Sequence, residues 1–226
     1  WSAEADGYKR KPSVVGAWAA AVSRFGTMSF SQILQPVIEL AENGYPVYQR
    51  MHDRLEQFSE RFRNLYPTTA AIYLPDGKVP EVGQIIRNPD FGKSMRIMCD
   101  AEDAAKSQGR VAGIEAARDA FYKGPIAKRI AEFIRENPVM DASGEAHAGL
   151  LSEEDMAEWE ATIEQPVTYE YKGLDVYKCP SWTQGPVFLQ QLAILKGFDL
   201  QDQGHNTTEY LHTVVESAKL AFADRD

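Results

Sequence analysis

Apolar and polar positions follow helical spacing through most of the chain, and a clear case lies near residue 30. Ser29 and Gln32 have the S-x-x-Q spacing of a capping box, which favours the start of a helix at about residue 30. Apolar residues then recur on one face of that helix, at Ile33, Val37, Leu40 and Ala41. Gly44 is suited to follow the end of the helix, and Pro36 should kink it or make it restart.

The following segments are less regular. Residues 52–62 have the pattern of a polar amphipathic helix. Residues 64–90 contain Pro67, Pro75, Pro80 and Pro89, with a Pro-Asp-Gly turn at residues 75–77. We expect an irregular stretch there, with one short strand at residues 71–74.

Three helices are predicted before residue 138. The first should begin at about Phe91, with Asp90 as its N-cap, and end before Gly109. The second covers residues 110–124, and the third has Pro125 at its first position, where a missing N–H is tolerated. Four apolar residues share one face of the third helix: Ile126, Ile130, Phe133 and Ile134.

A short helix and a hairpin come next. Ser152 and Asp155 have the spacing of a cap that opens a short helix. In PVTYEYKGLDVYKC, apolar or aromatic residues alternate with polar ones on both sides of Lys172-Gly173. This alternation around a dipeptide that can turn predicts a β-hairpin.

Two helices complete the pattern. One should begin near Pro186 and stop at Gly197, with Phe188, Leu192 and Leu195 facing inward. The other has its apolar positions at Leu211, Val214, Val215, Ala218 and Phe222. The chain therefore reads as a helix-rich globular domain with one hairpin.

Composition narrows the possible partners. Of the 226 residues, 44% are hydrophobic, which is ample for a packed core, and 33 acidic against 24 basic residues give a net charge of −9. Negative charge opposes binding to nucleic acid, and we expect no membrane partner because there is neither a polybasic patch nor a run of 18 apolar residues. No signal peptide is visible, and the charge fits a cytoplasmic or an exported protein equally well.

No motif of a common catalytic centre is present, such as G-x-S-x-G, a phosphate-binding glycine loop or H-E-x-x-H. Cys99 and Cys179 form no CxxC pair, so we expect ordinary thiols and no metal site. The acidic run at residues 153–155 fits a helix cap better than a catalytic dyad, and Asn206 fits either a glycosylation acceptor or a cap before Tyr210. The histidines lack metal-binding spacing, at His52, His147, His205 and His212.

The order of several longer segments is more specific. GLLSEEDMAEWEA precedes the hairpin, LQQLAILKGFDL follows it, and ESAKLAFADRD comes last. Upstream lie RFGTMSFSQILQPVIELAENGYPV and DAFYKGPIAKRIAEFI. In this order the segments resemble the large subunit of the γ-glutamyltransferase family, from about Pro12 to Asp226.

The resemblance implies an α+β fold, namely the helix-rich part of the four-layer αββα sandwich of N-terminal nucleophile hydrolases. Residues 1–226 would then be a single partial domain, a fragment of the large subunit. In the family, a small subunit released from the same precursor by self-cleavage begins with the catalytic Thr. Neither that Thr nor the Arg that grips the substrate α-carboxylate has a counterpart here, so we assign no catalytic residue to this chain and leave its substrate-binding residues unassigned.

The activity implied is transfer of a γ-glutamyl group from amides such as glutathione to water or an amine, through an acyl-enzyme. It needs no metal or organic cofactor. The implied partners are the small subunit and a small amide substrate.

Two turns depart from the family pattern. Residues 180–186, PSWTQGP, stand where P-P-P-S-S-G-G is usual, and residues 12–17, PSVVGA, stand where P-G-x-V-A-G is usual. These departures leave two alternatives open: a glutaryl or cephalosporin-type acylase of the same family, and a non-catalytic helical interaction module. Trp182 to Gly185 could wall the substrate entrance, although a packing turn is the simpler interpretation.

Overall fold

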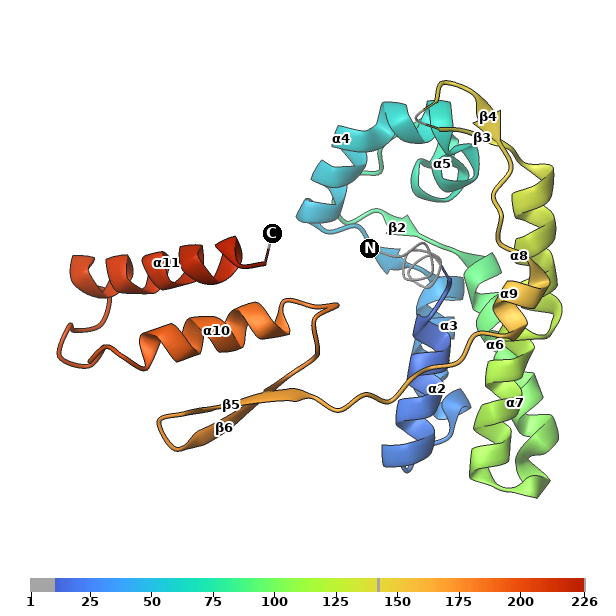
Figure 1. Ribbon diagram of the computed structural model, residues 1–226. Coiled ribbons are helices and arrows are strands. Elements are labelled where there is room, and N and C mark those ends of the chain that lie inside the picture. Colours follow the sequence, from blue (N-terminus) through green and yellow to red (C-terminus); the bar gives the residue numbers. More distant parts are fainter. Residues whose placement is uncertain (1–10, 142, 226) are drawn as a thin grey trace. The chain divides into compact units, whose positions relative to one another are not determined.

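The computed structural model describes residues 11–141 and 143–225. The described chain divides into two compact units, the first ending at Ala161 and the second beginning at Thr162 (Figure 1). Each unit has its own helices and short strands. That residues 1–226 belong to a single partial domain stays a prediction.

The first unit is built mainly from helices. They are α2 (Val14–Phe25), α3 (Phe30–Asn43), α4 (Gln49–Leu65), α5 (Pro67–Tyr73), α6 (Pro89–Ala105), α7 (Arg110–Tyr122), α8 (Pro125–Glu136) and α9 (Glu153–Ala157), with 3₁₀ turns η1 (Pro75–Gly77) and η2 (Lys106–Gln108). Two-residue strands pair antiparallel: β1 (Tyr45–Pro46) with β2 (Ile85–Ile86), and β3 (Val139–Met140) with β4 (Ala146–His147).

Two predicted helix starts depend on capping boxes, at Ser29 and at Ser152, and the structure confirms both. Ser29 Oγ accepts from the Gln32 amide at 3.1 Å, and Gln32 Oε1 accepts from the Ser29 amide at 2.9 Å. Ser152 and Asp155 form the same reciprocal cap on α9. Helix α3 runs without a break through Pro36, so it does not restart there.

Two expectations for the irregular stretch are wrong. The strand expected at residues 71–74 is instead part of helix α5, which begins at Pro67, a residue well suited to a first helical turn. The N-cap of α6 is Asn88, not Asp90: Asn88 Oδ1 accepts from the Phe91 amide at 3.1 Å. A proline at the first position of α6 moves the start of that helix upstream of the expected cap.

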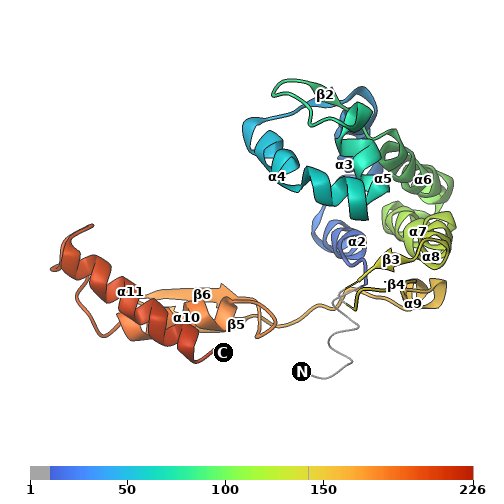
Figure 2. The same cartoon turned by 90° about the horizontal axis from the view of Figure 1, so that it is seen from above.

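The core of the first unit lies where α6 packs against α3 and α7, with α2 alongside α7 (Figures 1 and 2). Buried apolar side chains from these helices fill it, including Phe30, Leu34, Ile38, Met98, Ile114 and Ala117. At about 25 cal/mol per Å² of buried apolar surface, this packing is the main force that holds the helices together.

Two charged side chains satisfy the helix ends that meet at the α2–α3 connection. The Glu102 carboxylate, 5% exposed, accepts from the amides of Phe30 and Ser31 at 2.7 and 2.6 Å and from the Ser31 hydroxyl at 2.5 Å. Arg110 donates to the carbonyls of Val22 and Ser23 at the end of α2, at 3.0 and 2.9 Å. An anion therefore lies at a helix N-terminus and a cation at a helix C-terminus, each where the helix dipole favours it.

The second unit is a hairpin followed by two helices. Strands β5 (Val167–Tyr171) and β6 (Leu174–Lys178) pair antiparallel, and the helices are α10 (Gly185–Leu195) and α11 (Thr208–Ala223). Lys172 and Gly173 have φ values of 50° and 87°, as in the two-residue turns that suit hairpin twist, so the predicted hairpin is confirmed. Thr207 caps α11 by accepting from the Tyr210 amide at 3.2 Å.

The buried faces of these two helices agree with the prediction only in part: Leu195 of α10 is buried, as expected. Phe188 is 44% exposed, whereas Val187 and Leu189 are buried, because α10 packs against the hairpin and also against α11. On α11 the buried residues are Ser217 and Ala221. The larger apolar residues expected to face inward are exposed in the described chain, at Leu211, Val215 and Phe222.

Glu102→Gln should lower the free energy of unfolding of the protein by about 2 kcal/mol, since hydrogen bonds to a charged group contribute roughly 1.5–3 kcal/mol. The glutamine side chain would also point an NH₂ group at the backbone amides of Phe30 and Ser31, which are themselves donors. Urea denaturation measures the effect, with Glu115→Gln on the exposed part of α7 as the matched control. A loss no larger than that of the control would contradict the role of the carboxylate.

Candidate functional site

The turn singled out by the sequence, residues 180–186, joins the hairpin to α10. The Trp182 side chain is 63% exposed, and its Nε1 donates to Glu164 Oε2 at 2.6 Å. Thr183 Oγ1 donates to the Pro180 carbonyl and accepts from the Gly185 amide, both at 3.0 Å. The turn is thus held by its own hydrogen bonds, and its indole ring is presented on the surface of the second unit.

Gly185 is required by packing. A Cβ atom at this position would lie 2.0 Å from the carbonyl oxygen of Cys179, so no other residue fits without moving the backbone. The glycine therefore answers a packing need at the start of α10, as the simpler interpretation held. The exposed ring of Trp182 has no such explanation.

Two hollows adjoin the turn in the second unit. A small one of about 190 Å³ is lined by Thr162, Glu164, Pro166, Cys179, Pro180 and Trp182. A larger one of about 440 Å³ lies between the turn, α10 and Phe222, where the Lys178 ammonium sits 5.1 Å from the centre of the Phe188 ring. The Lys178 cation, the Glu164 carboxylate and the aromatic rings of these hollows can recognise a ligand, and the exposed Cys179 lines both hollows.

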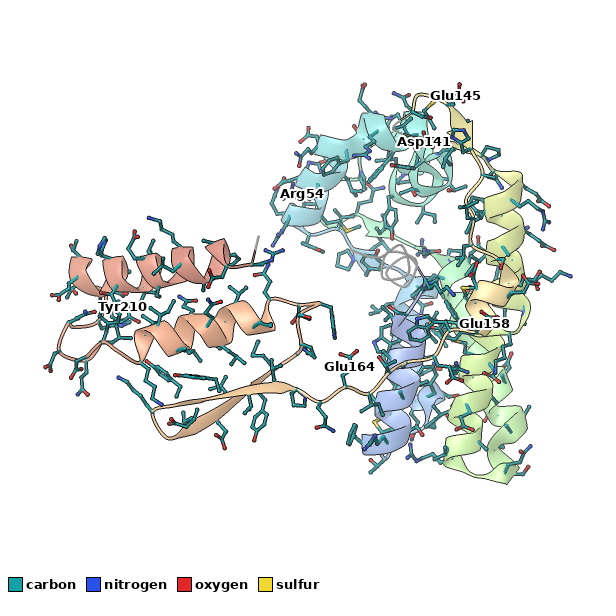
Figure 3. The ribbon with its side chains drawn as sticks, viewed as in Figure 1. Arg54, Asp141, Glu145, Glu158, Glu164 and Tyr210 are labelled. Atoms are coloured by element: carbon teal, nitrogen blue, oxygen red, sulfur yellow. The ribbon has the colours of Figure 1, made fainter. Side chains whose placement is uncertain are left out.

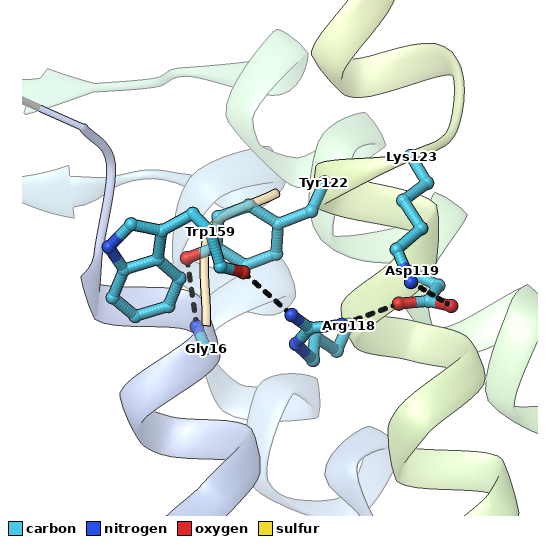
Figure 4. Close-up of polar contacts among 6 residues, drawn as sticks. All are labelled: Gly16, Arg118, Asp119, Tyr122, Lys123 and Trp159. Carbon is cyan, nitrogen blue, oxygen red and sulfur yellow. Dashed lines mark hydrogen bonds and ion pairs between the residues drawn. The ribbon is translucent and has the colours of Figure 1, made fainter. Parts of the chain in front are cut away.

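A second constellation, in the first unit, was not anticipated from the sequence (Figure 4). The buried Tyr122 hydroxyl donates to the Pro12 carbonyl at 2.6 Å and accepts from the Gly16 amide at 3.0 Å. The Trp159 ring stacks on the Tyr122 ring with centroids 5.3 Å apart. Arg118 Nη2 donates to the Trp159 carbonyl at 2.7 Å.

The electrostatics of this constellation fit a structural role and not that of an acid or base. We call Tyr122, Pro12, Gly16 and Trp159 the clamp, because their contacts join distant segments of the first unit. Burial raises the pKa of the Tyr122 phenol, so the hydroxyl stays neutral and keeps its proton for Pro12. Asp119 neutralises the cations beside it, with Oδ1 2.7 Å from Arg118 Nη1 and Oδ2 3.2 Å from Lys123 Nζ. The F-Y-x-G segment that carries Tyr122 was the one part of this constellation that the sequence indicated. The partners of Tyr122 could not be inferred, because they lie far away along the chain.

The remaining candidate residues have structural contacts. His52 Nδ1 bonds to the Pro80 carbonyl at 2.9 Å, and His147 Nδ1 lies 2.8 Å from Asp141 Oδ2. Burial raises the pKa of the Cys99 thiol, whereas the Cys179 side chain is exposed. In residues 11–141 and 143–225, no three His, Cys, Asp or Glu side chains are grouped so that they could hold a metal ion.

Membrane insertion finds no support in the helices. None of those in the described part of the chain is both long enough and apolar enough to cross a bilayer.

Gly16→Ala should destabilise the protein by about 1–3 kcal/mol, the usual cost of overpacking, because the new Cβ would lie 2.2 Å from the Trp159 ring. In a Trp159→Leu background the same change should cost much less, since the clashing ring is gone. A double-mutant cycle on unfolding free energies measures this coupling. Additive costs would contradict direct contact between the two residues.

Comparisons with known proteins agree with the family resemblance found in the sequence. The γ-glutamyltranspeptidase family model matches residues 11–226. The glutathione hydrolase-like YwrD proenzyme of Bacillus subtilis is 30% identical over 95% of this chain and 36% of its own length. The solved structure of LmbA2991HD is 37% identical, with a TM-score of 0.84 over 93% of this chain and 35% of that one.

A cephalosporin acylase structure from Bacillus halodurans is 27% identical, with a TM-score of 0.76 over 93% of this chain and 35% of that one. The chain therefore spans about a third of the length of these relatives. The likeness of fold confirms the α+β class. Because the family model covers nearly every residue, the chain belongs to the γ-glutamyltranspeptidase family.

Proposed function

We propose that this chain is part of a self-processing enzyme that cleaves γ-glutamyl amides such as glutathione and passes the acyl group to water or an amine. The observation that supports the proposal is the uninterrupted family match over residues 11–226. Relatives with matching segments of this kind include the glutathione hydrolase proenzymes of Escherichia coli and Bacillus subtilis.

The proposed chemistry is nucleophilic catalysis. The hydroxyl of an N-terminal Thr on a small subunit from the same precursor attacks the amide carbonyl, and its own α-amine accepts the proton. Preorganised donors stabilise the oxyanion, and water or an amine then releases the acyl group. This chain supplies helices that build the scaffold, and none of its residues is assigned to bond making.

An acylase acting on glutaryl or cephalosporin-type amides is the second candidate. Acylase ACY 1 proenzyme of Pseudomonas is 27% identical over 95% of this chain, close to the values for the glutathione hydrolases. The turn at residues 180–186 carries a bulky ring where many family members have proline, which favours a different acyl group. A non-catalytic interaction module is the third candidate, and it requires that the precursor never cleave itself.

We further propose that Trp182 borders the path of the substrate. Trp182 is 63% exposed and lines the smaller hollow, although its turn is already stabilised by other contacts. An exposed indole presents a large rigid surface for an apolar or amide ligand.

Trp182→Ala should change kcat/KM by roughly fivefold, about 1 kcal/mol, and unequally for glutathione and for a glutaryl amide. Steady-state kinetics on the complete enzyme measure this, with Tyr177→Ala as control, because Tyr177 is a 61% exposed aromatic residue on the neighbouring strand. Unchanged kcat and KM for both substrates would remove the proposal for Trp182.

The product of the complete gene should consist of two chains, the smaller beginning with Thr. Intact mass and N-terminal sequencing of the purified protein check this. A single uncut chain would refute the enzymatic proposal and favour the interaction module. If two chains form, release of glutamate from glutathione, compared with release of a glutaryl group from an amide, separates the first two candidates.

A further inference from the structure

Helix α4 carries an apolar row with alternating spacings of three and four residues. The row consists of Tyr48, Met51, Leu55, Phe58, Phe62 and Leu65. This is the repeat by which one helix packs along another. The charged residues Asp53, Glu56 and Glu60 fall on the opposite side of α4 and are exposed.

In the described part of the first unit, one edge of this row packs against the unit itself. Leu55 and Ser59 are buried, and His52 bonds to the Pro80 carbonyl, so this edge packs against the unit itself. Along the other edge runs a groove of about 310 Å³, lined by Tyr48, Arg50, Met51, Arg54, Leu55, Phe58 and Phe62. Tyr48 is 62% exposed and Leu65 is 39% exposed.

The open edge is positively charged. Arg50, Arg54 and Arg61 follow it, and Figure 3 shows Arg54 on α4. Within residues 11–141 and 143–225 these arginines form no ion pair; Arg54 donates to the neutral Gln57 side chain at 2.6 Å, and Arg61 to the Tyr66 hydroxyl at 3.2 Å. A binding partner that complements these arginines carries carboxylates along the facing edge. The arginines stand out because the chain as a whole has a net charge of −9.

A second copy of the chain does not match this edge. Two α4 helices packed antiparallel would oppose arginine to arginine across the contact. Packed parallel, each Arg54 would need the edge that carries His52 and Ser59, which already packs against the first unit. Charge complementarity therefore disfavours pairing of α4 with the α4 of a second copy.

We propose that this face of α4 docks an amphipathic helix with carboxylates along one edge, supplied by the same precursor from outside residues 1–226. Relatives extend far enough for this, since the matched segment is only 33–36% of their length. A covalently linked helix also binds at high effective concentration. The docking is independent of the catalytic activity proposed above.

A zero-length cross-link tests the proposal on the complete protein. Arg54→Lys places an amine at the open edge, and a carbodiimide joins an amine to a carboxylate only where the two are in contact. Peptide mapping should then find position 54 linked to an Asp or Glu of one helix outside residues 1–226. Arg129→Lys is the matched control, because Arg129 is exposed on α8 and lies in no such row.

A second variant separates docking from chance contact. Adding Phe58→Ala to Arg54→Lys should lower the yield of that cross-link at least about fivefold, because the apolar contact is lost while the charge stays. The proposal is overturned if the yield at position 54 does not exceed that of the Arg129→Lys control, or if the link falls within residues 1–226. A link between isotopically light and heavy copies in a mixed sample would overturn it in favour of self-association.

Discussion

The hydrogen bonds of the buried Glu102 side chain are the contact on which the first unit depends. Taking a carboxylate out of water costs several kcal/mol, and only a full set of donors offsets that cost. The donors are the first amides of α3 and the Ser31 hydroxyl, so α6 can bury Glu102 only when α3 has begun at Phe30 and lies in one register against it. Arg110, just beyond η2, is exposed and adds hydrogen bonds to the end of α2 without a comparable cost of burial.

Features determined by neighbouring residues were predictable from sequence. The caps at Ser29 and Ser152 and the turn at Lys172-Gly173 each depend on side chains within a few positions, and all three are present. Where packing between distant segments decides which residues are buried, the prediction was wrong in part. The apolar residues of α11 have the expected helical spacing, but the residues that α11 buries are the small Ser217 and Ala221, since small side chains let two helices approach closely.

The candidate functional residues show the same difference between local patterns and distant packing. Family segments located the turn around Trp182, because its flanking strand and helix have strong local patterns. The clamp around Tyr122 could not be found in this way, since its partners Pro12, Gly16 and Trp159 are brought together only by the packing of α2, α7 and α9. In this chain, the side chains of the clamp come together through contacts between distant segments, and no short stretch of sequence indicates those contacts.

The length of chain between the parts of that clamp sets an order of events during synthesis. Tyr122 bonds to Gly16 and Pro12 across 106 and 110 residues. A ribosome adding about 5–20 residues per second needs roughly 5–20 s to cover that distance. Throughout that interval Val15 and Ala19 of α2, which are buried in the folded unit, lack the helices that cover them. The packing of α2 into this core therefore cannot be completed before the segment that carries Tyr122 has been synthesised.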